Sequence, residues 1–373
     1  MLRLAAASIA LAAANAFAVD PAILGSELGV EPSKEIVEQR AFKDIVVAPI
    51  PISNPTVGTG LAVVAMPFYN LERDSPLSNT AVAVGLTSNG SWGAAAVQST
   101  RLRGDTARID GTVAYGEVHY RFYGAGADAG TGGQSVPIVQ KVALFAPEIL
   151  FQVAKYTFAG LRYRGLRVET VLEDGNSSLP PPVAAVLPNS VTIVSSGIGP
   201  KLTYDSRDNE MNPASGGLVE LRTNFADEAL GSDFTYQTYQ LGANYYGKLG
   251  RGVLAARGYG CKASDRTPLF DLCLYGANRD LRGYVTGRYR DRTMFAAQSE
   301  YRFPVAGRFG GVVFAGSGKV AGAFSEMGNE PWLPSYGVGV RWLAAETAKV
   351  NLSVDVAKGR DSTGVYVYVK ESF

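Results

Sequence analysis

Apolar and polar residues alternate one by one through the last part of the chain. The alternation is cleanest in residues 293–303, 336–343 and 350–356. In the second of these segments, the apolar positions are Tyr336, Val338, Val340 and Trp342. Successive side chains of a β-strand point to opposite faces, so each segment is predicted to be a strand with one apolar and one polar face.

The same kind of pattern extends over residues 44–373, where Gly, Pro, Asn and Asp clusters separate about sixteen predicted strands. A soluble β-sandwich also alternates, with its apolar faces turned inward. A barrel is favoured because the polar faces carry charges and glycines, as a wet lumen would, and because the connections are alternately short and long. A sheet in lipid must also close to satisfy its backbone. We therefore predict an all-β fold, a transmembrane antiparallel β-barrel.

The N-terminus reads as a secretory signal peptide over residues 1–18. Arg3 provides the charged start, residues 4–14 the apolar core, and Ala16-Phe17-Ala18 a small-residue cleavage site. Residues 19–43 are polar and acidic, and we expect a short periplasmic segment there. The predicted organisation is therefore signal peptide, periplasmic segment and barrel.

Overall composition excludes two classes of protein. The net charge of +1 gives no electrostatic reason to expect nucleic acid as a partner. Beyond the signal peptide, no run of about 18 apolar residues is present, so a membrane-spanning helix is not expected. Export places the chain in an oxidising compartment, where Cys261 and Cys273 are expected to form a disulfide. The alternative is two free, buried thiols.

A charged loop at residues 278–291 interrupts the late strands. Its centre reads Leu281, Arg282, Gly283 and Tyr284. This Leu-Arg-Gly-Tyr core resembles the loop signature of the BamA/TamA outer-membrane assembly superfamily (the bacterial surface antigen family). Four other segments resemble that family in the same order: residues 51–60, 203–217, 299–304 and 337–342. The resemblance implies a barrel whose sixth outer loop folds into the lumen and is anchored to the inner wall by its arginine.

The chain departs from that family in two places. Residues 19–43 are too short for the periplasmic POTRA domains that receive client proteins, so we expect a short member lacking them. In the thirteenth strand, Gly316 stands where the family usually has an acidic residue. We therefore expect Glu300, on the lumen face of the neighbouring strand, to pair with Arg282. The alternative is an Arg282 that is exposed to water.

The last predicted strand ends on an aromatic residue. Val365, Val367, Val369 and Phe373 are expected to share one face. This pattern resembles the C-terminal signal that assembly machinery reads on outer-membrane proteins, although Glu371 interrupts it. Pro49 and Pro51 remove hydrogen-bond donors from the first strand, which is compatible with a weak seam between the first and last strands.

Catalytic patterns are poor. His119 is the only histidine, so any histidine-based triad would depend on it. The sequence has no Gly-x-Ser-x-Gly elbow, no phosphate-binding loop and no Cys/His cluster for zinc. We expect neither an enzyme nor a cofactor or metal site.

The resemblance implies a protein of the bacterial outer membrane that assists insertion or translocation of proteins or other macromolecules. Its expected partners are outer-membrane lipid and client proteins or periplasmic subunits. The alternative is a passive channel or structural barrel that kept the fold without assembly activity.

Overall fold

The computed structural model describes residues 44–54, 56–76, 78–133, 135–173, 190–209, 212–276, 281–345, 349–369 and 371–373. The predicted signal peptide (1–18) and periplasmic segment (19–43) lie outside these residues, as do residues 278–280 of the charged loop.

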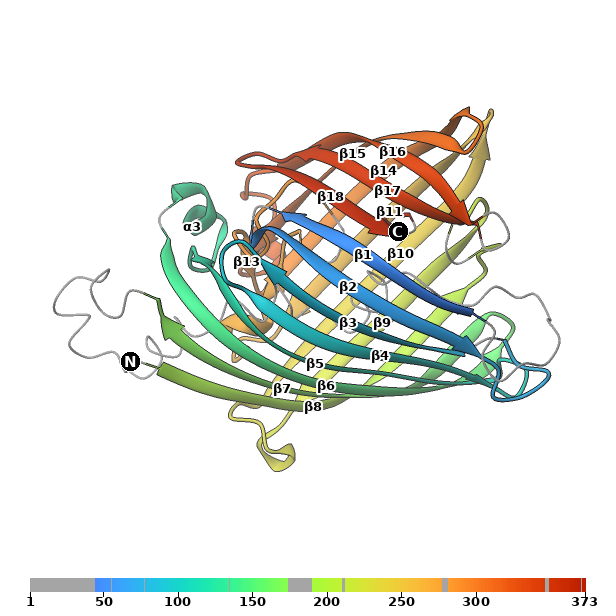
Figure 1. Ribbon diagram of the computed structural model, residues 1–373. Coiled ribbons are helices and arrows are strands. Elements are labelled where there is room, and N and C mark those ends of the chain that lie inside the picture. The colour runs from blue at the N-terminus through green and yellow to red at the C-terminus, as the bar shows by residue number, and fades with distance from the viewer. Residues whose placement is uncertain are drawn as a thin grey trace, which may run out of the picture.

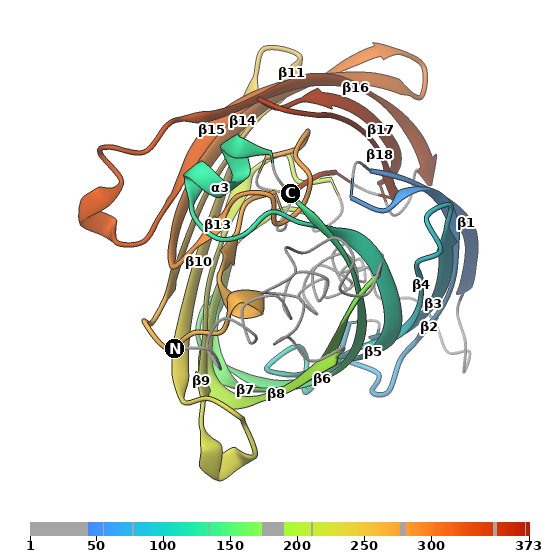
Figure 2. The ribbon, with the colours of Figure 1, turned by 90° about the vertical axis from the view of Figure 1, so that its left-hand side faces the viewer.

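In the described part of the chain, sixteen strands form one antiparallel sheet that curves into a nearly closed barrel (Figures 1 and 2), as predicted. Each strand pairs with the next strand of the sheet along the chain. The strands are β1 (Asp44–Asn54), β2 (Gly58–Tyr69), β3 (Ser78–Thr87), β4 (Trp92–Leu102), β5 (Ala107–Phe122), β6 (Val136–Ala154), β7 (Thr157–Leu172), β8 (Ser190–Asp205), β9 (Gly216–Ala226), β10 (Tyr236–Leu249), β11 (Gly252–Ala263), β14 (Thr293–Ala306), β15 (Phe309–Ala321), β16 (Leu333–Ala345), β17 (Val350–Lys358) and β18 (Thr363–Val369).

The side chains of the late strands β16 and β17 are arranged inside out relative to a soluble protein. On β17, Leu352, Val354 and Val356 face outward and are 37–46% exposed, whereas Ser353 and Asp355 face inward and are fully buried. On β16, Val338 and Val340 face outward while Arg341 is buried inside. A soluble β-sandwich would bury these apolar faces, so the sandwich alternative is excluded. Exposed apolar side chains around the outside of a barrel are the arrangement that lipid requires.

The barrel has a weak point where its two end strands meet. β1 and β18 lie side by side (Figure 1), but they are the two ends of the hydrogen-bonded order, and no backbone pairing between them is found among the described residues. β18 has 7 residues, compared with 19 in β6. Pro49 and Pro51 lie in β1, on this edge of the sheet, where a missing N–H donor costs least.

Short elements decorate the connections. They are α3 (Ala127–Gly132), η2 (Glu228–Leu230), η3 (Leu269–Asp271), η4 (Phe324–Glu326) and the two-residue strands β12 (Cys273–Leu274) and β13 (Arg290–Asp291). Among the described residues, the helices are all too short to cross a membrane. β12 and β13 belong to the connection between β11 and β14, and Figure 2 shows β13 within the ring of strands.

Candidate functional site

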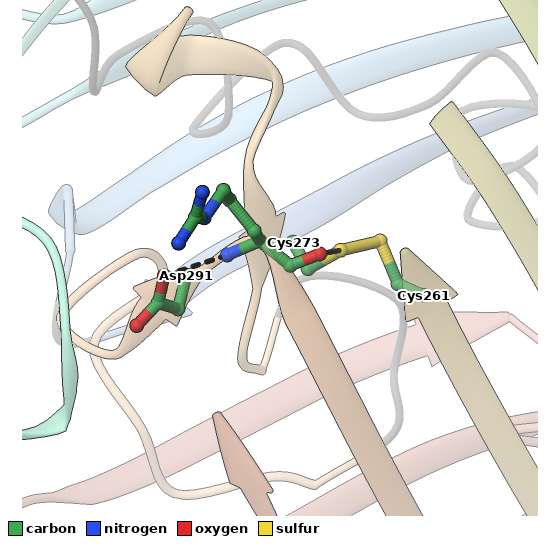
Figure 3. The surroundings of a disulfide bond; sticks show 4 residues. Cys261, Cys273 and Asp291 are labelled. Atoms are coloured by element: carbon green, nitrogen blue, oxygen red, sulfur yellow. Dashed lines mark hydrogen bonds between the residues drawn. A yellow bond between two sulfur atoms is a disulfide. The ribbon is translucent and has the colours of Figure 1, made fainter. Parts of the chain in front are cut away.

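The connection between β11 and β14 spans residues 264–292, and we call it the lumen loop; its described residues, 264–276 and 281–292, fold into the barrel. A disulfide joins Cys273 of β12 to Cys261 of β11, with a Cα–Cα distance of 5.7 Å (Figure 3). β12 pairs with β13, so that Cys273 lies opposite Asp291 in this small ladder (Figure 3). The loop is therefore tied covalently to the barrel wall near its start, and its two arms hold each other.

Arg282 at the centre of the lumen loop is buried against the inner wall. Its Nη2 donates a hydrogen bond to Glu300 Oε2 on β14 at 2.8 Å. Its Nη1 donates to Asp355 on β17 and, at 3.0 Å, to the Tyr368 hydroxyl on β18. Its guanidinium carbon also lies 3.4 Å from the centroid of the Phe314 ring. The structure thus brings Arg282 and Glu300 together and leaves Arg282 4% exposed.

Asp355 is the partner that sequence reasoning missed. It is fully buried, and it is separated from Arg282 by 73 positions. Its place on the polar face of residues 350–356 was the available signal, because a carboxylate on a lumen face must find a cation or water. The guanidinium of Arg282 therefore bridges two carboxylates rather than one, which suits its fork of donors.

The missing acidic residue on β15 has a steric explanation. A Cβ atom at Gly316 would lie 2.6 Å from Leu281 Cδ2 and 2.5 Å from the Ala297 carbonyl oxygen. At Gly318 it would lie 2.8 Å from the Tyr275 ring. The lumen loop therefore packs directly on the backbone of β15, and no side chain fits beneath it at these positions.

Gly283 is required by its backbone. Its φ is +98°, and a Cβ atom there would lie 2.5 Å from the Gly359 nitrogen. Its N–H donates to the Tyr366 hydroxyl at 2.7 Å, and its carbonyl accepts from Ser362 Oγ at 2.6 Å. The glycine lets the loop backbone approach the β17–β18 turn closely and bond to it on both sides.

Three tyrosines form the apolar part of the same site. Tyr275, Tyr284 and Tyr289 are buried and meet edge to face, with centroid distances of 4.9, 5.8 and 6.4 Å. The Tyr284 hydroxyl donates to the Pro334 carbonyl at 2.6 Å, and the Tyr289 hydroxyl donates to Asp361. Burial raises the pKa of both Tyr284 and Tyr289, so these phenols stay neutral.

The lumen loop is also held at distant parts of the ring. Asp271 of η3 accepts from the Tyr236 hydroxyl on β10 at 2.7 Å and from Arg164 on β7. The N–H of Thr286 donates to Thr56 Oγ1 in the β1–β2 turn at 2.9 Å. The lumen loop is therefore held at β7, β10, β17 and the β1–β2 turn, which are separate parts of the ring of strands. The sequence offered no motif for Asp271.

The end of the chain differs from the expected C-terminal signal. Val365 faces outward on β18, and Val367 is half-buried. Val369 is the last residue of β18, and its side chain lies outside the described set. Phe373 does not share their outer face, because the chain leaves the sheet after β18 and turns inward. Its ring centroid lies 6.5 Å from that of buried Tyr246 on β10.

Three comparisons place these features among known proteins. Residues 191–363, which include the lumen loop, match the model of the Omp85 superfamily domain. A search of curated proteins finds no match. Among solved structures, BamA from Haemophilus ducreyi lacking POTRA domains 1–3 aligns with a TM-score of 0.59 at 14% identity, covering 89% of this chain and 71% of that one.

CdiB from Escherichia coli aligns with a TM-score of 0.58 at 12% identity, and CdiB from Acinetobacter baumannii with 0.55 at 11%. Each covers 89% of this chain, but this chain spans only 63% and 60% of theirs. These likenesses show the fold. Together with the domain match, they confirm the resemblance to the BamA/TamA superfamily that the sequence motifs predicted.

Proposed function

We propose that this chain, which carries an Omp85 superfamily domain over residues 191–363 in a 16-stranded barrel, works in the bacterial outer membrane. Its proposed task there is to assist the insertion or translocation of proteins or other macromolecules. Its partners would be outer-membrane lipid on the apolar outer belt, and client proteins or periplasmic subunits. The solved structures that support this proposal are a BamA and two CdiB proteins.

The observation that carries the proposal is the incomplete seam. β1 and the short β18 end the hydrogen-bonded order, and the described residues contain no backbone pairing between them. An unpaired strand edge is a template on which another chain can add a strand. Separating β1 from β18 would therefore break no described ladder bond and would open the wall toward lipid, which is the passage that a protein entering the membrane needs.

The lumen loop supports the same proposal over a passive channel. Its attachments at Arg282, Asp271 and Thr286 lie on separate parts of the ring, and a loop held in this way would obstruct the pathway through the barrel at rest. A steadily conducting pore needs a lumen that is open without a conformational change. A barrel that is closed at rest and weak along one seam suits a function performed by opening.

The test compares the outer-membrane proteome of cells with and without this gene. Loss of one or a few β-barrel or surface proteins, restored by the parent chain, is the expected result and would name the client. Complementation with Arg282→Gln should fail, whereas Arg101→Gln, which breaks a luminal ion pair between β4 and β5, should still restore the proteome. An unchanged proteome would refute the assembly role. Steady single-channel conductance of the purified parent would then favour the passive channel.

A further inference from the structure

Residues 371–373, here called the tail segment, lie inside the barrel beyond the end of β18. Glu371 and Ser372 are each 2% exposed. Burying a carboxylate is costly unless cations and hydrogen-bond donors surround it. A buried Glu371 therefore requires a site that the barrel wall provides, and four strands contribute to it.

Side chains from β14, β16 and β17 hold Glu371 and the end of the tail segment. Glu371 accepts hydrogen bonds from Arg341 Nε on β16 and from Asn351 Nδ2 on β17, each at 2.7 Å. Arg302 of β14 lies 3.5 Å from the same carboxylate. Its Nη2 donates to the backbone oxygen of Phe373 at 2.8 Å.

The aromatic end of the tail segment is enclosed by the same wall. The guanidinium carbon of Arg302 lies 5.6 Å from the Phe373 ring centroid and at the same distance from the Tyr246 ring centroid. Tyr246 is itself buried beside Phe373. The acidic side chain of Glu371 and the aromatic side chain two positions later thus bind to separate parts of one site.

The arginines that hold the tail segment also hold the partners of the lumen loop. Arg302 contacts Glu300 at 2.6 Å, and Arg341 contacts Asp355 at 2.5 Å. Glu300 and Asp355 are the two carboxylates that bind Arg282. Three guanidiniums and three carboxylates therefore alternate through one buried network, with the loop at one end and the tail segment at the other.

We propose that Tyr246, Arg302, Arg341 and Asn351 form a luminal binding site for a peptide segment of the pattern acidic–x–aromatic, that residues 371–373 occupy this site, and that their occupancy holds the lumen loop in place. If Glu371 leaves, three guanidiniums share two carboxylates. Arg302 and Arg341 then compete with Arg282 for Glu300 and Asp355. Because such coupling is reciprocal, releasing Arg282 must weaken the hold on the tail segment by the same factor.

The first experiment measures release of the tail segment in the full chain. With Cys261 and Cys273 paired, Ser372→Cys introduces the only free thiol, and its alkylation rate reports exposure. Adding Arg282→Gln should raise that rate at least tenfold, whereas adding Arg101→Gln should not. Conversely, Glu371→Gln should speed tryptic cleavage of the lumen loop after Arg282 by a similar factor. Equal alkylation rates with and without Arg282→Gln would overturn the coupling.

The second experiment tests the site with a peptide in trans. A chain that ends at residue 370 should show fast cleavage of the lumen loop. Adding N-acetylated Glu-Ser-Phe should slow this cleavage at millimolar concentration, because a short tether gives a segment an effective concentration in the millimolar range. The matched Gln-Ser-Phe peptide should have no effect. Slow cleavage without the tail segment, or equal effects of the two peptides, would refute the site. If the shortened chain does not fold, the same peptides are compared on full-length Glu371→Gln. The inference concerns the closed barrel and does not rest on the proposed assembly role.

Discussion

The strongest prediction concerns Arg282→Gln. Glutamine removes the charge and the hydrogen bonds from Nη1 and Nη2 to the two carboxylates, while Glu300 and Asp355 remain buried at 1% and 0% exposure. Breaking one partner of a buried ion pair costs about 3–5 kcal/mol. Arg302 and Arg341 still neutralise the two carboxylates, so we expect the lower end, about 3 kcal/mol. At about 1.4 kcal/mol per tenfold change, the released-loop population should rise roughly a hundredfold.

The assay is tryptic cleavage after Arg288, a lumen-loop site that the substitution leaves intact. When loop opening and closing are fast relative to cleavage, the rate tracks the open population. Arg101→Gln is the control, because it breaks a partly buried pair with Asp110, 2.7 Å away, on other strands. It should lower the thermal midpoint of the barrel without exposing the loop. Unchanged cleavage in Arg282→Gln, or equal acceleration in both variants, would refute the lock.

The second carboxylate also changes what a charge reversal should do. A glutamate at position 282 would face Asp355, and an arginine at position 300 would lie beside Arg302. The double variant Arg282→Glu with Glu300→Arg should therefore recover only part of the loop protection lost in either single variant. If the double variant is protected no better than either single variant, Arg282 does not pair directly with Glu300.

Three further outcomes follow from single positions. Gly283→Ala should release the lumen loop, because the positive φ of Gly283 and the nearby Gly359 nitrogen exclude a Cβ atom. The control Gly258→Ala should not release it, because the space around Gly258 is open. Equal cleavage rates in both variants would contradict this prediction. Burial raises the pKa of Tyr284 and Tyr289, so the stability they contribute is complete below the ordinary tyrosine pKa of about 10 and is lost as pH rises through the folded values. Tyrosinate absorbance should therefore rise together with loop cleavage, and cleavage that stays constant through the titration would count against it. Val354→Arg on the outer face should lower the stability of the barrel in the membrane by about 2–4 kcal/mol if the position lies near the bilayer centre. The measured result should be a lower yield of refolding into vesicles. An unchanged yield would contradict a lipid-facing belt.

Much of the fold could be predicted because strand periodicity is local. Tyr336 and Arg341 reveal opposite faces of one strand without any knowledge of its neighbours. The Leu-Arg-Gly-Tyr core marked the loop that enters the lumen. Glu300 could be named as a partner because alternation places it on the polar face of residues 293–303, beside the strand in which Gly316 stands where the family usually has an acidic residue. The strand faces needed only residues that lie close together along the chain, whereas the loop and its partner also needed the family resemblance.

What only the tertiary structure decided depends on closure of the sheet. Alternation alone could not tell which face of β17 points outward, because a sandwich and a barrel share the same period. The structure places Val354 on the outer face and Asp355 on the inner face. Asp271 meets Arg164, and Arg282 meets Asp355, only because the ring brings distant strands together. Phe373 was expected to share the outer face with the valines of the last strand. Instead, Glu371 pairs with Arg341 inside the barrel, and Arg302 binds the backbone oxygen of Phe373 there. Residues 371–373 therefore lie inside. Periodicity specifies a strand, whereas charge pairing across a closed lumen specifies which distant residues meet.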